Sequence, residues 1–149
     1  MKLSQMLSAK IIVILNILIG SLVYGQEELT NEHKQMLKYD NTAYFSTLVN
    51  KENIDKCYVI ENNSYTLLAL AIKMNSTQIF QKLIDEKADL EKICDGKTAL
   101  MFAAKYGNTD MAKKLLQNGA KKDTKTDKGY TALDYARKYE KPDIIKLLE

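Results

Sequence analysis

The stretch GKTALMFAA, residues 96–104, decides the fold because it recurs along the chain. The stretch GYTALDYAR, residues 129–137, repeats the pattern further on, and SYTLLALAI, residues 64–72, is a looser copy that precedes it. Self-similarity at a period of about 33 residues indicates a stack of small units that bury their cores against one another. Such a stack offers an extended surface rather than a catalytic pocket, so its default function is to hold another molecule.

Each unit is predicted to contain two short helices. In the best-defined unit, Thr98 opens the first helix, and Gly107 ends it in the left-handed conformation. Asn108 is expected to N-cap the second helix, whose apolar residues recur at helical spacing until Gly119 ends it.

The other units depart from this pattern at the ends of their helices. Asn75 and Lys87 stand where the preceding unit should have its two glycines, and Ser76 stands at the N-cap. Glu140 takes the first glycine position of the last unit, and Pro142 lies just inside its second helix, where the missing N–H is harmless. A non-glycine residue in the left-handed conformation costs roughly 1 kcal/mol.

Before residue 60 the repeat pattern fades. We expect helices over residues 28–38 and 41–50, and a long connection over residues 53–64. The predicted division is a divergent N-terminal capping repeat over residues 26–60, repeats over 61–93 and 94–126, and a C-terminal capping repeat over 127–149.

Residues 1–25 have the order of a secretory signal peptide. Two lysines precede the apolar run of residues 11–19, and small residues follow it, so we expect cleavage before Gln26. The alternative is an uncleaved membrane anchor, but the run is short of the roughly 20 apolar residues that a spanning helix needs, and Asn16 interrupts it.

Removal of residues 1–25 leaves one small domain, residues 26–149, in which 20 basic and 19 acidic residues give a net charge of +1. The chain lacks a clustered basic stripe, so we expect no nucleic-acid partner. The compact signal and the abundance of Lys, Ile and Asn favour a bacterial-type exported protein, periplasmic or secreted, that is monomeric by itself.

These units resemble ankyrin repeats. That family's pattern is a loop glycine, Thr-Pro-Leu-His-x-Ala, a helix-ending glycine, an apolar second helix and then Gly-Ala. Residues 94–126 match it at Gly96, Thr98, Leu100, Ala103, Gly107, Leu115, Leu116, Gly119 and Ala120. The resemblance implies an all-α solenoid of helix-turn-helix units with hairpin-like connectors, about three to four repeats including the caps.

No unit has the family's Pro or His, so the hydrogen bonds that the His would make between units are expected to be missing. We therefore expect modest stability.

The resemblance also implies that partners contact the finger tips and the exposed ends of the first helices. That surface holds Asn62, Asn63, Tyr65, Lys73, Met74, Asp95, Lys97, Lys105, Tyr106, Asp127, Lys128, Tyr130, Lys138 and Tyr139. Three lysines in this set align down the stack beside two tyrosines and a methionine, a composition that suits a protein partner with an acidic contact face. The alternative is that these lysines only favour the helix dipole.

The sequence offers little for catalysis or for metal binding. His33 is the only histidine, and we expect it on the surface without a catalytic role. The chain has no glycine-rich phosphate loop, and two cysteines with one distant histidine do not make a zinc site. We therefore expect no enzyme activity, no cofactor and no metal.

Cys57 and Cys94 lie in successive connectors. Equivalent points of neighbouring repeats are too far apart for a disulfide, which favours two separate thiols. The offset between the two residues and the length of the first connector leave a disulfide open.

Together these features predict a non-catalytic protein-binding module for an exported partner, such as an inhibitor or immunity-type protein. Two alternatives remain: a general envelope protective or scaffold factor, for example in oxidative-stress support, and a membrane-anchored binding domain.

Overall fold

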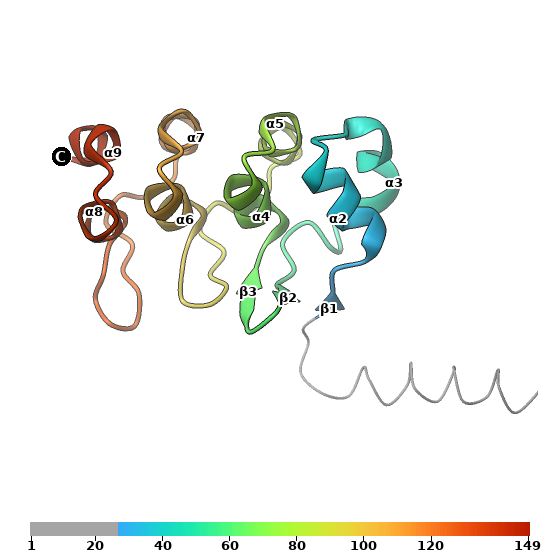
Figure 1. Cartoon of the computed structure of the whole chain (residues 1–149), viewed down its shortest axis with the longest axis horizontal. Coiled ribbons are helices and arrows are strands. Elements are labelled where there is room, and N and C mark those ends of the chain that lie inside the picture. Colours follow the sequence, from blue (N-terminus) through green and yellow to red (C-terminus); the bar gives the residue numbers. More distant parts are fainter. Residues whose placement is uncertain (1–26) are drawn as a thin grey trace, which may run out of the picture.

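The computed structural model describes residues 27–149, in which pairs of antiparallel helices stack side by side (Figure 1). The predicted signal peptide and its alternative, a membrane anchor, fall outside these residues. The first helices α4, α6 and α8 form one row and the second helices α5, α7 and α9 form another. Their bounds are Leu67–Met74 for α4, Thr77–Asp85 for α5, Ala99–Tyr106 for α6, Thr109–Gln117 for α7, Ala132–Lys138 for α8 and Pro142–Leu148 for α9. The predicted solenoid of helix-turn-helix units is therefore confirmed.

The N-terminal unit is less helical than predicted. It consists of β1 (Glu27–Glu28), α2 (Asn31–Lys38), the 3-10 turn η1 (Thr42–Tyr44) and α3 (Phe45–Leu48). The predicted helix over 28–38 begins late because residues 27 and 28 pair with a strand instead.

The second predicted helix of this unit, 41–50, ends early because side chains compete for its backbone. Asn50 accepts hydrogen bonds from the backbone N–H groups of Glu52 and Asn53, at 2.8 and 3.2 Å, and Asn53 accepts one from the N–H of Asn50 at 2.8 Å. Such local bonds favour a turn over a helix.

The long connection over residues 53–64 contains the first strand of a β-hairpin. Strands β2 (Tyr58–Ile60) and β3 (Asn63–Tyr65) pair antiparallel, and β1 pairs parallel with β2, giving a sheet of order β1-β2-β3. We call this hairpin finger 1 (residues 57–65) and the two later connectors finger 2 (residues 88–97) and finger 3 (residues 120–130).

A threonine N-cap starts each first helix at the predicted place. The hydroxyl oxygens of Thr66, Thr98 and Thr131 accept hydrogen bonds from the backbone N–H three residues later, at 3.0, 3.4 and 3.3 Å. Asp134 completes a capping box by accepting from the N–H of Thr131 at 2.8 Å. These caps fix where each first helix begins.

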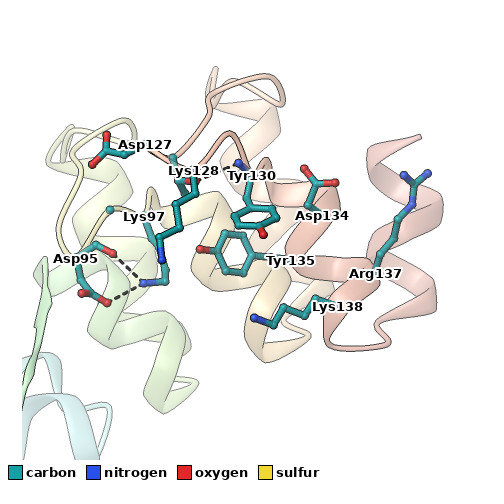
Figure 2. Close-up of a pocket in the computed structure, with 11 residues that line it drawn as sticks. Asp95, Lys97, Asp127, Lys128, Tyr130, Asp134, Tyr135, Arg137 and Lys138 are labelled. Carbon is teal, nitrogen blue, oxygen red and sulfur yellow. Dashed lines mark hydrogen bonds and ion pairs between the residues drawn. The ribbon is translucent and has the colours of Figure 1, made fainter.

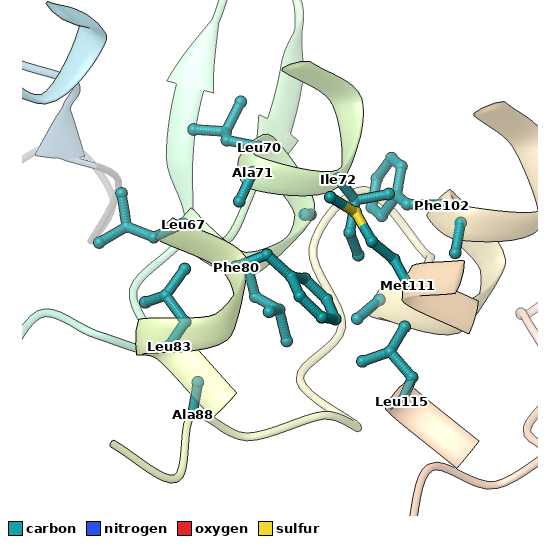
Figure 3. Packing of buried hydrophobic residues seen from close by; sticks show 14 of the residues in the cluster. Leu67, Leu70, Ala71, Ile72, Phe80, Leu83, Ala88, Phe102, Met111 and Leu115 are labelled. Carbon is teal, nitrogen blue, oxygen red and sulfur yellow. The ribbon is translucent and has the colours of Figure 1, made fainter. Parts of the chain in front are cut away.

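The core lies between the two rows of helices (Figure 3). Residues 67–72 of α4 and 99–104 of α6 are all buried, because each first helix touches the first helices on both sides and its own second helix. The fully buried alanines Ala71, Ala103 and Ala104 allow these helices to approach closely.

Left-handed residues end the helices, including the predicted non-glycine ones. Asn75, Lys87 and Glu140 have φ of 56, 63 and 53°, and Gly107 and Gly119 have φ of 83 and 96°. The geometry of the repeat is therefore kept even where the glycine is absent.

The polar residues expected to cap α5 and α7 bond to the preceding repeat instead. Ser76 and Asn108 occupy the N-cap positions but make no side-chain cap. The Ser76 hydroxyl donates to the backbone carbonyl of Leu37 at 2.5 Å, and the Asn108 amide donates to that of Ile72 at 2.6 Å. The expectation concerned only the bonds of the family's His, and here other side chains supply hydrogen bonds between units by reaching the carbonyls at the end of the neighbouring first helix.

An acidic side chain from the N-terminal unit caps α5. Asp40 accepts hydrogen bonds from the backbone N–H groups of Gln78 and Ile79, at 2.9 and 2.8 Å. A carboxylate at this end of a helix also interacts favourably with its dipole. The N-terminal unit thus supplies the cap that Ser76 does not.

Candidate functional site

Three lysines form a row across the first helices, which we call the Lys column: Lys73, Lys105 and Lys138. They lie in the last turns of α4, α6 and α8, and each stands at the same offset from the threonine that caps its helix. The shared offset places the three ammonium-bearing side chains at the same level of neighbouring helices.

Aromatic rings hold the ammonium groups of the Lys column. The Nζ of Lys73 donates to the hydroxyl of Tyr65 at 3.1 Å and lies 4.5 Å from its ring centroid. Lys105 Nζ lies 5.4 Å from the ring centroid of Tyr106 and 5.7 Å from that of Tyr139, and Lys138 Nζ lies 5.8 Å from Tyr139. These are cation–π distances, so the rings attract the charges and restrict their positions.

Tyr106 connects the aromatic residues beneath the column. Its ring stacks on Phe102 at 6.4 Å between centroids, and Phe102 in turn contacts Tyr65 at 5.3 Å. Burial, together with the charge and hydrogen bond of Tyr65 and the charge of Tyr139, raises the pKa of Tyr106 to about 12. The phenol is therefore neutral at physiological pH and remains a hydrogen-bond donor.

The structure separates the predicted contact residues into exposed and buried ones. Met74, Tyr130 and Tyr139 are 41, 53 and 37% exposed, which agrees with a role in contacts. Tyr65 is only 4% exposed, so its prediction as a surface residue is wrong. Phe102 of the next repeat covers its ring, and its hydroxyl serves Lys73 instead.

A groove of about 690 Å³ lies between fingers 2 and 3 and extends over α8 (Figure 2). Six predicted contact residues line it: Asp95, Lys97, Asp127, Lys128, Tyr130 and Lys138. Sequence reasoning missed Gly96, Thr126, Asp134, Tyr135 and Arg137. The repeat alignment could have found Tyr135, which takes the place of Phe102 in the next repeat and packs edge-on against Tyr130 at 6.4 Å.

Two of the acids lining this groove already have partners within the protein. Lys97 Nζ pairs with the Asp95 carboxylate at 2.7 Å, and the carboxylate of Asp134 accepts from the N–H and hydroxyl of Thr131, both at 2.8 Å. The bonds from Thr131 hold the pKa of Asp134 below its usual value. Lys128 and Lys138 remain as cations that a ligand could contact.

Cys57 and Cys94 are joined by a disulfide, with their Cα atoms 5.8 Å apart. The expectation of two separate thiols, which the repeat spacing favoured, is therefore wrong. The alternative that the offset between the two residues left open is correct. The bond lies beside a second cavity, of about 490 Å³, between fingers 1 and 2. Of the predicted contact residues, Asn62, Asn63 and Asp95 line this cavity.

A family model described as "Ankyrin repeats (3 copies)" matches residues 33–126 and 88–149, and thus most of the chain. This chain belongs to the ankyrin-repeat family. Ankyrin repeats are general protein–protein interaction modules.

Curated relatives share parts of this ankyrin stack. The chain is 33% identical over 94 residues to mouse "Ankyrin repeat and SAM domain-containing protein 6", an alignment that covers 60% of this chain and 11% of that protein. It is 41% identical over 69 residues to mouse "Neurogenic locus notch homolog protein 1", covering 46% and 3%. A "Transient receptor potential cation channel subfamily A member 1 homolog" of Caenorhabditis elegans is 31% identical over 86 residues, covering 56% and 7%. The chain spans about a tenth or less of the length of each.

The one histidine of this ankyrin domain has a structural role. His33 is 7% exposed, not on the surface as expected, and its ring bonds to the Thr30 hydroxyl at 2.8 Å and to the Leu48 carbonyl at 3.2 Å. Burial follows because α2 turns this face toward α3, so the ring ties the two helices together. Within residues 27–149, no three His, Cys, Asp or Glu side chains are placed to hold a metal ion.

No helix in the described part of the chain has the length and apolar character needed to cross a membrane.

Proposed function

We propose that this chain is a non-catalytic binding protein that captures an exported or envelope protein through its finger tips and the exposed ends of its first helices. The observation that carries the proposal is the Lys column, whose three ammonium groups lie over aromatic rings at one level of the stack. Lysines steer an acidic partner, and the exposed Tyr130 and Tyr139 supply contact area at low entropic cost.

Two features support export to the periplasm or to the medium. The N-terminal order of residues 1–25 is typical of a signal peptide. The disulfide between Cys57 and Cys94 suits an oxidising compartment, because thiols are kept reduced in the cytosol.

We favour a dedicated inhibitor or immunity-type protein over a general envelope factor. The lysines of the column are already held by aromatic rings, so a partner that binds them loses less free energy in ordering their side chains. A pre-ordered surface suits one defined partner face better than many unrelated clients.

The test is capture of partners from an extract of the source cell envelope by the immobilised, purified protein, with identification by mass spectrometry. We expect one dominant partner in a one-to-one complex. A set of weakly bound clients would instead indicate the general protective or scaffold role, and no captured protein would contradict the proposal.

A charge-reversal variant tests whether capture of the partner depends on the Lys column. Lys73→Glu, Lys105→Glu and Lys138→Glu together should abolish it, because they place three like charges against an acidic face. The matched control reverses one lysine on each second helix, Lys82→Glu, Lys113→Glu and Lys146→Glu, with the same change in net charge, and should bind as the unmodified protein does. Equal capture by both triple variants would contradict a role for the column.

A further inference from the structure

We propose that the Lys column receives carboxylates placed at every third residue of an extended acidic segment in the partner. This inference rests on the proposed function and specifies the chemistry of the partner at the same surface.

The charge of the Lys column is not matched by acids of the protein itself. Among residues 27–149, none of the three lysines forms an ion pair. Two of the acids that line the groove already have partners within the protein, Asp95 in Lys97 and Asp134 in Thr131. Three ammonium groups are therefore without a carboxylate of their own, and an acidic ligand complements them.

The ammonium groups of the column are held in place by aromatic side chains. Lys73 is bonded to the hydroxyl of the buried Tyr65. The ring of Tyr139 lies within cation–π distance of both Lys105 and Lys138, at 5.7 and 5.8 Å. A side chain fixed in this way loses less conformational entropy when it binds an anion. The column can therefore respond to the spacing of charges in its ligand, not only to their number.

The spacing of the lysines follows from the spacing of their helices. The helices α4, α6 and α8 are direct neighbours, and packed helices lie roughly 8–10 Å apart. Since each lysine stands at the same offset from its capping threonine, the helix spacing is also the spacing of the column. A polyproline II segment advances about 9 Å for every three residues and returns each third side chain to the same face. A β-strand would point every third side chain to alternate faces, so the polyproline II form fits better.

The experiment compares two synthetic peptides of identical composition by NMR titration of the purified protein at low ionic strength. One is five repeats of Asp-Pro-Pro, and the other has the same five aspartates at every second position with the remaining prolines following. The first peptide should bind about threefold more tightly, because it can form three ion pairs in register, whereas its isomer has aspartates on one face only at every sixth residue and can form two. The resonances that move should belong to α4, α6 and α8.

Single substitutions complete the test. Lys105→Gln should weaken the Asp-Pro-Pro peptide by about threefold and reduce its preference over the isomer. Lys82→Gln, an exposed change on α5, is the control and should alter neither value. Equal affinities for the two peptides, or an unchanged affinity in Lys105→Gln, would overturn the inference.

The experiments test the spacing of charges in the ligand separately from the proposed function. If the peptides bind equally while charge reversal of the column still abolishes capture of the partner, the spacing is wrong and the proposed function stands. If charge reversal leaves capture intact, both are wrong.

Discussion

The side chains at the starts of α5 and α7 act between repeats rather than within them. Ser76 and Asn108 each donate to a backbone carbonyl near the end of the preceding first helix, that of Leu37 or Ile72. The acceptor belongs to the backbone, so the bond does not depend on the residue type in the neighbouring repeat. Donor residues of different kinds, a hydroxyl and an amide, can therefore fill one role.

Replacement of Asn108 tests this bond. Asn108→Ala should lower the free energy of unfolding by about 1 kcal/mol, because it removes one hydrogen bond between repeats. Asn118→Ala is the control, since its exposed amide bonds only within its own helix, to the carbonyl of Lys114. Urea denaturation measures both, and an equal loss in the two variants would contradict a special role for Asn108.

Replacement of Lys87, which has a left-handed backbone conformation, by glycine should stabilise the protein. Lys87 has φ of 63°, so Lys87→Gly should raise the free energy of unfolding by about 0.5–1 kcal/mol, the relief of left-handed strain less the extra entropy of a glycine. Glu86→Gly, at the neighbouring exposed residue with φ of −78°, should lower it instead. Thermal unfolding distinguishes the two, and a loss at both positions would count against strain at Lys87.

At the scale of residues, the sequence predicted the features that recur within each repeat. It did not predict those that depend on side-chain contacts with the next repeat. The capping threonines and the left-handed positions follow from one unit's own pattern. The burial of Tyr65 could not be predicted in the same way, because the ring that covers it belongs to Phe102 in the next repeat. The alignment of the Lys column followed from the period, but the aromatic rings that hold it depend on side-chain geometry.

Among the elements, the N-terminal unit differs most from the other repeats. Its second helix, α3, spans four residues, whereas α5 and α7 span nine each. Its helices bury fewer apolar residues than α4 and α5 do. Strand β1, the cap provided by Asp40 and the disulfide of the hairpin that follows α3 join it to the rest. Sequence periodicity overestimated both helices here. Residues 27 and 28 pair with β2 instead of extending α2, and the asparagine-containing turn at residues 50–53 offers the backbone after α3 other partners.

The disulfide should contribute chiefly to this unit. It links residues separated by 37 positions, for which loop-closure entropy corresponds to about 4 kcal/mol. We expect Cys57→Ser with Cys94→Ser to increase hydrogen exchange in α2, α3 and the β-hairpin, while α6 and α7 change little. Reduction of the unmodified protein by a dithiol should reproduce the pattern, and a uniform increase across all helices would contradict it.

At the scale of the whole molecule, the outer face of the last repeat is polar at positions that are apolar in the preceding repeat. Arg137 and Glu149 take the positions that Ala104, which is fully buried, and Leu116, which is partly buried, hold in the preceding repeat. The two charged side chains pair at 3.1 Å and are both 56% exposed. A charge pair at this face opposes the stacking of a second molecule.

Removal of this pair should therefore promote self-association. Arg137→Ala with Glu149→Leu restores the residues of the preceding repeat and leaves an apolar face beside Leu133 and Ile145. Sedimentation should show a mass that rises with concentration. The control, Lys113→Ala with Asp110→Leu, removes another exposed ion pair, on α7, and should keep the mass of the unmodified protein. Unchanged sedimentation in both double variants would contradict the role of the outer face.

The disulfide also divides the molecule mechanically. Under tension applied across residues 27–149, the repeats after Cys94 can unravel to their full contour, but the 37-residue span from Cys57 to Cys94 cannot lengthen while the bond is intact. At roughly 3.3–3.6 Å per extended residue, about 130 Å of chain is shielded from force. A reductant would release this length, so the same molecule would extend by different amounts in oxidising and reducing surroundings.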